Sequence, residues 1–316
     1  MDERSKRTLH IIMGLVVAVL LGTVYSSYLM PQKTHLVFGA TYMTMNNPFY
    51  EVINNELKKE IEKKGDELIV RNPELDIDKQ NEQIEEFISK KVDGIFVNPI
   101  DSSKLTSLES AREAGIPIIA IDASVDNTDL IDCLIESDNY DAGVLCAQNM
   151  MQRVQSANIV LLKHSTVESA VSRIQGFVDT IKDYPQYKII DSAECEGQLE
   201  RAMPAMESIL KKHVKIDVIM ALNDPAALGA LAAIESLNRT NILVYGVDGT
   251  PDLKSFIKQS PFIAGTAAQS PIKFGTLAAK NMYKILERKD IPKTIEVPVT
   301  FITKDNIDSY NVKGWQ

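Results

Sequence analysis

The sequence predicts an α/β fold with two lobes, each a doubly wound parallel sheet with helices on both faces. Short apolar runs alternate with amphipathic helical patterns, which is typical of βαβ units and a parallel sheet. A second series of strand and helix patterns follows the first, and together they contain more strands than one compact sheet would hold in a chain of this length. The length of 316 residues also fits roughly two domains of about 150 residues each.

The first round of alternation covers the segment from Lys33 to Ser124. A buried apolar strand is predicted first, and then a helix from Phe49 to Lys64 that Gly65 stops. Two more helices are predicted at residues 78–92 and 103–115. The predicted strands are residues 35–42, 66–72, 93–99 and 116–124.

The second round begins at Ala157. Its predicted strands are residues 157–165, 187–194, 216–224, 241–249, 261–269 and a closing run at 295–303. The helices between them are predicted at Ala170–Tyr184, Gln198–His213, Pro225–Asn238, Pro251–Lys258 and Pro271–Arg288. Proline at the start of three of these helices is the residue expected at a first helical position.

An apolar stretch from Leu9 to Met30 precedes this body and follows the basic residues Arg4, Lys6 and Arg7. About 20 apolar residues suffice to span a bilayer as a helix, and a basic flank stays in the cytoplasm. We expect a single-pass transmembrane anchor within residues 1–32, with the N-terminus inside and the body outside, periplasmic or extracellular. A cleaved signal peptide remains the alternative, with Val24 to Ser26 as a weak cleavage site.

Composition removes several classes of function. The formal charge of −9 argues against nucleic acid as a partner, because phosphate binding needs clustered Lys and Arg. The three cysteines, Cys133, Cys146 and Cys195, form no CxxC pair, so we expect buried free thiols and neither a disulfide framework nor a metal site. We expect no cofactor, since no dinucleotide, phosphate-loop or nucleophile-elbow motif occurs.

Polar side chains gather at the predicted strand ends, where open α/β sheets bind their ligands. A carboxylate accepts hydroxyl hydrogen bonds and an amide both donates and accepts, so these groups suit a small, uncharged, hydroxyl-rich molecule. Beside this interpretation stand structural ones: Asn98 and Asp248 as turn formers, Asp224 as a helix cap, and Phe49 as core. The strand-end residues are Asn47, Phe49, Tyr50, Asn98, Asp122, Lys163, His164, Asn223, Asp224, Asp248 and Gln269.

The chain resembles the periplasmic sugar-binding family of the ribose-binding type, from about Lys33 to the C-terminus. The stretches that carry the resemblance are "MNNPFYEVI", "DGIFVNPIDSS", "AGIPIIAID", "ESDNYDAG", "SRIQGF", "ALNDPAALGALAAI" and "VYGVDGTPD". The resemblance implies two lobes joined by three hinge crossings, near Glu136–Asp138, Gln269–Ser270 and Pro298. Lobe one is then residues 33–136 plus 270–297, and lobe two is residues 137–269 plus 298–316.

The resemblance also implies a sugar-binding set. Its members are Asn47, Phe49, Tyr50, Asp122, Arg173, Asn223, Asp248 and Gln269. Four positions depart from the family pattern: Ala123 and Val171 stand where arginines are usual, and Gly197 and Val247 where aromatics are usual. At Arg173 the family's arginine is more often structural. These departures imply a ligand pose unlike that of a ribose carrier, with a pentose such as xylose or ribose or a similar polyol as the expected class, and a sugar-related furanone signal as another.

Two partners are consistent with the resemblance. An anchored member without a lipid-bearing cysteine is similar to xylose-sensing binding proteins that partner a LytS-type histidine kinase, whereas a transport carrier would partner an ABC permease. Functions of other classes are a glycosidase, which needs two opposed carboxylates such as Asp122 and Asp248, and a repressor, which needs a basic N-terminal helix-turn-helix. We expect a binding protein rather than an enzyme.

Overall fold

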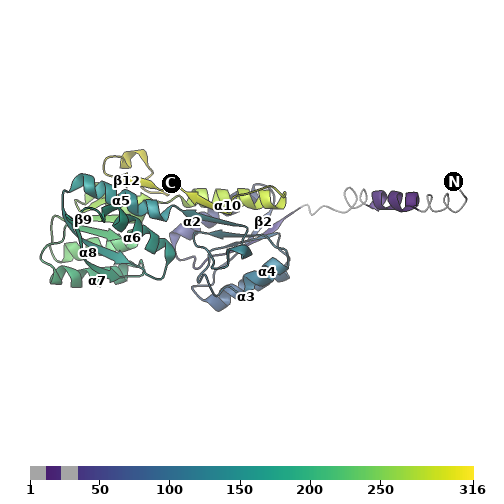
Figure 1. Ribbon diagram of the computed structural model, residues 1–316, viewed down its shortest axis with the longest axis horizontal. Coiled ribbons are helices and arrows are strands. Elements are labelled where there is room, and N and C mark those ends of the chain that lie inside the picture. Colours follow the sequence, from purple (N-terminus) through teal and green to yellow (C-terminus); the bar gives the residue numbers. More distant parts are fainter. Residues whose placement is uncertain (1–11, 23–34) are drawn as a thin grey trace, which may run out of the picture. The chain divides into compact units, whose positions relative to one another are not determined.

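Residues 12–22 and 35–316 are described by a computed structural model of the protein (Figure 1). Residues 37–316 form one compact unit that contains two six-stranded sheets. The strand orders are β11-β5-β4-β3-β1-β2 in the first sheet and β12-β10-β9-β8-β6-β7 in the second. The prediction of an α/β fold with two mainly parallel sheets is confirmed.

The first sheet contains the N-terminal half of the body and one later strand. Helices α2 and α10 pack against each other, and α3 packs against α4. The strands are β1 (Val37–Thr41), β2 (Glu67–Arg71), β3 (Gly94–Val97), β4 (Ile118–Ile121), β5 (Cys133–Ser137) and β11 (Thr294–Val297). The helices are α2 (Pro48–Glu62), α3 (Ile77–Ser89), α4 (Ser107–Glu113) and α10 (Pro271–Leu286), with the 3-10 turn η1 (Thr128–Leu130).

The second sheet contains most of the C-terminal half. Its strands are β6 (Ala157–Lys163), β7 (Tyr187–Glu194), β8 (Val218–Ala221), β9 (Leu243–Asp248), β10 (Ile263–Ala268) and β12 (Thr300–Thr303). Its helices are α5 (Asn139–Arg153), α6 (Glu168–Ile181), α7 (Leu199–Lys212), α8 (Asp224–Ser236) and α9 (Pro251–Gln259), with the 3-10 turn η2 (Ile307–Ser309). Figure 1 shows α6, α7 and α8 gathered around this sheet, away from α3 and α4.

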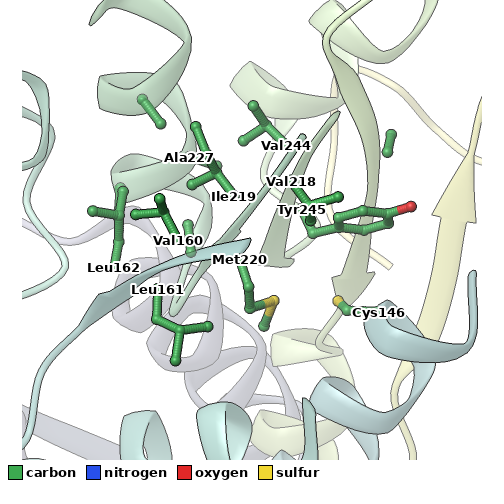
Figure 2. Close-up of a cluster of buried hydrophobic side chains, with 14 of the residues drawn as sticks. Cys146, Val160, Leu161, Leu162, Val218, Ile219, Met220, Ala227, Val244 and Tyr245 are labelled. Atoms are coloured by element: carbon green, nitrogen blue, oxygen red, sulfur yellow. The ribbon is translucent and has the colours of Figure 1, made fainter. Parts of the chain in front are cut away.

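Strand side chains alternate between the two faces of the second sheet, as a doubly wound sheet requires. Figure 2 shows Leu161 and Met220 pointing toward the face on which Cys146 of α5 lies, while Leu162 and Ile219 point to the opposite face. Every residue of β8 and β10 is buried, and both strands consist of consecutive apolar or small residues, as expected of strands covered on both faces. The prediction of buried free thiols is confirmed for Cys133, Cys146 and Cys195.

The chain passes between the sheets three times: from β5 to α5, from β10 to α10, and from β11 to β12. The last crossing uses only two residues, Pro298 and Val299, which is too short for a crossover helix. Strand β12 therefore turns back and pairs antiparallel with β10. The alternation alone predicts residues 295–303 as one closing run, whereas the structure divides this run between β11 and β12, which belong to different sheets.

Strand β5 and helix α5 were missed in the sequence. The strand has five residues and follows a 3-10 turn, and α5 begins two residues after it. Short apolar runs of this kind carry little periodic signal.

The predicted anchor falls mostly outside the described residues. Of that stretch, residues 12–22 are described and are helical and exposed. Within residues 12–22 and 35–316, no helix is both long enough and apolar enough to cross a bilayer.

Candidate functional site

Tyr50, in the first turn of α2, meets Asp122 at the carboxyl end of β4. The Tyr50 hydroxyl donates a hydrogen bond to Oδ2 of Asp122 at 3.1 Å. Asp122 has a φ of +70°, an unusual conformation outside glycine, and its N–H donates to the Ile135 carbonyl at 2.7 Å. Backbone strain that the surrounding structure holds in place is common at functional sites.

The Asp122 carboxylate lies in an electrostatic environment that elements of the second sheet help to set. Burial raises its pKa above the ordinary value, while the positive charge of Arg173 on α6 opposes that shift. Burial also raises the pKa of Tyr50, and the charges of Asp122 and Asp248 act in the same direction. The strand ends of the two sheets also meet directly, because Ser137 at the end of β5 donates to Oε1 of Gln269, which follows β10, at 2.7 Å.

Arg173, Asp248 and Gln269 form the second half of this site. Arg173 Nη1 donates to Oδ1 of Asp248 at 3.3 Å, and Gln269 Nε2 donates to the same oxygen at 2.7 Å. Burial raises the pKa of Asp248, and Arg173 opposes the shift. Arg173 and Gln269 are buried, whereas the Asp248 side chain keeps 16% of its surface exposed. Asp248 is thus the most exposed member of this trio.

The sequence interpretation of Asp224 as a helix cap is wrong, since Asn223 caps α8. The side-chain oxygen of Asn223 accepts from Ala226 N–H at 3.0 Å, and its amide donates to the Gly197 carbonyl. Asp224 is fully buried and accepts from Thr250 N–H at 2.7 Å and from the Thr266 hydroxyl at 2.7 Å. It ties α8 to the strand ends of β9 and β10.

Asn47 and Phe49 lie at the start of α2. The Asn47 side chain caps this helix by accepting from Phe49 N–H at 2.9 Å, and Asn47 is exposed. The Phe49 ring is buried and contacts the rings of Tyr50, Phe274 and Trp315 at centroid distances of 5.6, 5.8 and 5.7 Å. Both residues have structural roles, and these roles hold them beside Tyr50.

Asn98 is a cross-strand bridge rather than a simple turn former. Its amide donates to the Ile121 carbonyl at 3.0 Å, and its oxygen accepts from Met43 N–H at 3.2 Å. It is fully buried and joins the ends of β1, β3 and β4. The strand ends that present Asp122 are therefore fixed relative to one another.

Three residues near the site were not singled out in the sequence. Ser137 donates to Gln269 Oε1 at 2.7 Å, and Asn139 accepts from Arg173 Nε at 2.8 Å. Trp315 contacts Phe49. Their partners are far away in the chain, so only the "ESDNYDAG" stretch, which contains the first two, offered a signal.

A separate hollow of about 750 Å³ lies at the opposite end of the second sheet. Its lining includes Arg153, Asp217, Asn241 and Phe262, next to the start of β6, β8, β9 and β10. None of the predicted site residues lines it. Ligands of open α/β sheets bind at the carboxyl ends of the strands, so we place the site at Asp122 and Asp248.

The chemistry of the site is that of hydrogen bonding. It combines two carboxylates, one guanidinium, a phenol and amides, which match hydroxyl groups well. Among residues 12–22 and 35–316, no group of three or more His, Cys, Asp or Glu side chains is arranged to hold a metal ion.

Comparison with known proteins defines the family. The model of the periplasmic binding protein domain matches residues 38–290. The ribose import binding protein of Bacillus subtilis (strain 168) is 31% identical over 274 residues, which are 86% of this chain and 88% of that protein. The chain belongs to the periplasmic binding protein domain family, and its fold is of the ribose-binding type.

Other relatives and solved structures extend the comparison. The D-apiose import binding protein of Actinobacillus succinogenes is 29% identical over 71% of this chain and 73% of that protein. A solute-binding protein of Actinobacillus succinogenes with bound D-allose has a TM-score of 0.82 at 26% identity, covering 87% of this chain and 100% of that one. The arabinose-binding protein of Shewanella sp. ANA-3, bound to L-arabinofuranose, has a TM-score of 0.80 at 25% identity, covering 86% and 93%.

Proposed function

We propose that this chain is an extracytoplasmic binding protein for a small sugar, with a pentose such as xylose or ribose as the ligand. The single observation that carries the proposal is geometric: the Tyr50–Asp122 bond of the first sheet and the Arg173–Asp248–Gln269 bonds of the second lie at strand ends that Ser137 joins to Gln269. A ligand held between these groups would contact both sheets at once.

Each residue has a role in the proposed complex. Asp122 and Asp248 accept hydrogen bonds from ligand hydroxyls, and charge-assisted bonds of this kind are the strong ones. Asn47, Asn223 and Gln269 supply amide groups, while Phe49 and Tyr50 supply an aromatic wall on the lobe-one side. Arg173 donates a hydrogen bond to Asp248 and is proposed to hold that carboxylate toward the ligand.

Closure of two lobes is the proposed response to the ligand. Lobe one is residues 33–136 plus 270–297, and lobe two is residues 137–269 plus 298–316. Three short crossings between two otherwise separate sheets are the arrangement expected of a hinge. A ligand that contacts both lobes binds the closed arrangement better than the open one, and it therefore shifts the population toward closure.

The names of the relatives support the proposed ligand class. Curated relatives are named for ribose, D-apiose and xylitol, all five-carbon sugars or polyols. The sequence departures at Ala123 and Val171 support a pose that differs from that of a ribose carrier. We therefore keep the class as small sugars and polyols, with pentoses first.

A membrane-anchored sensor that signals to a histidine kinase is the proposed context, and the binding component of a sugar ABC transporter is the alternative. The apolar stretch from Leu9 to Met30 supports the sensor, while the relatives named as import binding proteins support the transporter. In the first case the proposed location is the cell membrane, with the body outside. Membrane fractionation with protease protection, followed by cross-linking to the partner, separates the two.

An enzyme is the weaker proposal. A glycosidase needs one carboxylic acid and one carboxylate set across the sugar, and Asp122 and Asp248 would have to serve. Both carboxylates already accept hydrogen bonds from the protein. Tyr50 donates to Asp122, and Asp248 accepts from Arg173 and Gln269, which supports binding instead of catalysis. Incubation with aryl pentosides, followed by measurement of released phenol, tests the enzymatic alternative.

A thermal-shift screen of the full chain tests the proposed function. A ligand that binds only the folded state adds about 2.7 kcal/mol of stability at a hundredfold excess over its dissociation constant. The screen uses pentoses, hexoses, pentitols and inositols, with sucrose as the control for a general osmolyte effect. Stabilisation by one small sugar at millimolar concentration is expected, and the absence of any selective shift would contradict the proposal.

A further inference from the structure

Five residues at the junction of the two sheets form a closed ring of hydrogen bonds, made by their side chains and one backbone carbonyl. Ser137 donates from Oγ to Gln269 Oε1 at 2.7 Å, and Gln269 Nε2 donates to Asp248 Oδ1 at 2.7 Å. Arg173 donates from Nη1 to the same Asp248 oxygen at 3.3 Å and from Nε to Asn139 Oδ1 at 2.8 Å. Asn139 Nδ2 closes the ring by donating to the Ser137 carbonyl at 3.1 Å.

The ring passes through two of the three crossings. Ser137 is the last residue of β5 and Asn139 the first of α5, so these two bracket the first crossing. Gln269 lies in the second crossing, between β10 and α10. The third crossing is linked to the first by a backbone hydrogen bond, which Asp138 N–H donates to the Val297 carbonyl at 3.1 Å. A change in the angle between the sheets must therefore move members of the ring.

Four of the ring residues are buried and one is not. Ser137, Asn139, Arg173 and Gln269 have exposed fractions of 2, 6, 6 and 3%, whereas the Asp248 side chain keeps 16%. Asp248 also has a φ of +128°, a conformation that side chains rarely adopt. The ring thus presents one carboxylate outward and holds it in an unfavourable backbone conformation.

The position of Arg173 in the ring depends on close packing between α5 and α6. A side chain at Gly143 would collide with the Arg173 carbonyl, and one at Gly176 would collide with the Tyr140 carbonyl. Glycine at both positions lets the helix backbones approach closely, which brings Arg173 to Asn139. The helix that carries Arg173 is therefore held against the crossing that carries Asn139.

We propose that Ser137 and Asn139 are positioning residues which, through the ring, couple the ligand-facing carboxylate of Asp248 to the angle between the two sheets. Contact between a ligand and Asp248 then changes the strength of the ring's hydrogen bonds, and these bonds connect Asp248 to the first and second crossings. Affinity depends on side chains that do not touch the ligand. The role of Asp248 as a ligand contact rests on the proposed function, whereas the restraint of the hinge by the ring does not.

The test measures the distance between the sheets in the full chain without ligand. Spin labels are placed on Glu82→Cys in α3 and Lys211→Cys in α7, both exposed, and the distance distribution is recorded by pulsed electron spin resonance. The three native cysteines are buried, and burial raises the pKa of each thiol, so labelling is directed to the two new sites.

Ser137→Ala removes one ring bond, and Ser107→Ala is its matched control. Ser107 is also a buried serine, and its hydroxyl donates to the amide oxygen of Asn81 at 2.8 Å, far from the crossings in sequence and outside the ring. We expect the distribution of the Ser137→Ala protein to broaden and its mean to shift, with Ser107→Ala matching the wild type. Ser137→Thr keeps the hydroxyl and should restore the wild-type distribution.

Affinity for the sugar found in the screen gives the second readout. A coupling of this kind is typically worth at least about fivefold in affinity, so Ser137→Ala should weaken binding by that factor and Ser107→Ala should not. An unchanged distance distribution in Ser137→Ala overturns the ring proposal, whether or not a ligand is known. A changed distribution in a protein that binds no sugar would instead support the ring and contradict the proposed function.

Discussion

The Tyr50 hydroxyl donates to the Asp122 carboxylate at 3.1 Å, and this bond joins the first turn of α2 to the end of β4. The ring of Tyr50 is held in turn by Phe49 and Tyr42, at centroid distances of 5.6 and 6.1 Å. Asp122 is thereby oriented before any ligand arrives. Orientation in advance lowers the entropy cost of binding, since fewer groups must be ordered when the ligand binds.

The first prediction concerns this bond. Tyr50→Phe removes the donor and keeps the ring, so the fold should persist while the Asp122 carboxylate loses its fixed orientation. A hydrogen bond to a charged group contributes about 1.5–3 kcal/mol, and we expect sugar affinity to fall by roughly tenfold or more. Isothermal titration calorimetry measures the loss. Tyr140→Phe is the control, because Tyr140 donates to Asp179 at an exposed position.

A second prediction concerns the pH dependence of stability at the first crossing. Burial raises the pKa of Glu136 from 4.5 to about 7, and the charges of Glu296, Glu168, Asp122 and Asp138 add to the shift. Glu296 lies directly opposite Glu136 on the neighbouring strand. The folded state therefore holds a proton that the unfolded state releases between pH 4.5 and 7, and stability falls as the pH rises through that window.

Glu136→Gln removes the titrating group. We expect the variant to be more stable than the wild type at pH 8, by on the order of 1 kcal/mol after allowance for screening of a half-buried carboxylate, with the difference vanishing near pH 4.5. Thermal unfolding at several pH values checks this. Glu109→Gln, at an exposed position on α4, serves as the control. A gain in stability that does not depend on pH would contradict the explanation.

A third prediction concerns the segment from Asn311 to Gln316. Lys254 is fully buried, and its Nζ donates to the carbonyls of Asn311 and Gly314 and to Oε1 of Gln316, at 2.8, 2.6 and 2.8 Å. Burial lowers the pKa of Lys254 to about 8. Gln316 in turn donates to the Gln269 carbonyl at 3.2 Å, so this segment reaches the second crossing.

Lys254→Met keeps the aliphatic stem and leaves three acceptors without their donor. We expect a loss of roughly 2 kcal/mol or more in the free energy of unfolding. The sequence has one tryptophan, Trp315, and release of the segment should shift its fluorescence to longer wavelength. Lys258→Met, one turn further along α9 and exposed, is the matched control. Equal losses in the two variants would show that the three bonds contribute little.

The sequence alone predicted the alternation, both sheets and the strand ends that carry Asp122 and Asp248, because period, turn residues and strand tips are local features. It did not predict β5, whose five residues carry little periodic signal, or the 15-residue helix α5 that follows it. It also assigned the cap of α8 to Asp224, whereas Asn223, one residue earlier, makes the capping bond. Adjacent candidates of equal propensity are separated only by the three-dimensional arrangement.

The contacts of Arg173 illustrate what sequence reasoning could not reach. Its partners Asn139, Leu222 and Asp248 lie 34, 49 and 75 residues away. Ser137 and Gln269 are 132 residues apart. Such pairs are set by how the two sheets and their crossings pack, and no local pattern encodes them. The motif "SRIQGF" drew attention to Arg173, and the structure shows its hydrogen bond to Asp248.

Calorimetric titration of the full chain with the sugar that the thermal screen selects, in parallel for the wild type and Asp122→Ala, tests the proposed sugar site most directly. We expect saturable binding to the wild type and a loss of about tenfold to a hundredfold in the variant, with unfolding still cooperative, because a charged acceptor of hydroxyl hydrogen bonds is removed. Wild-type affinity in the variant, or no sugar bound by the wild type, would contradict the placement of a sugar site at Asp122.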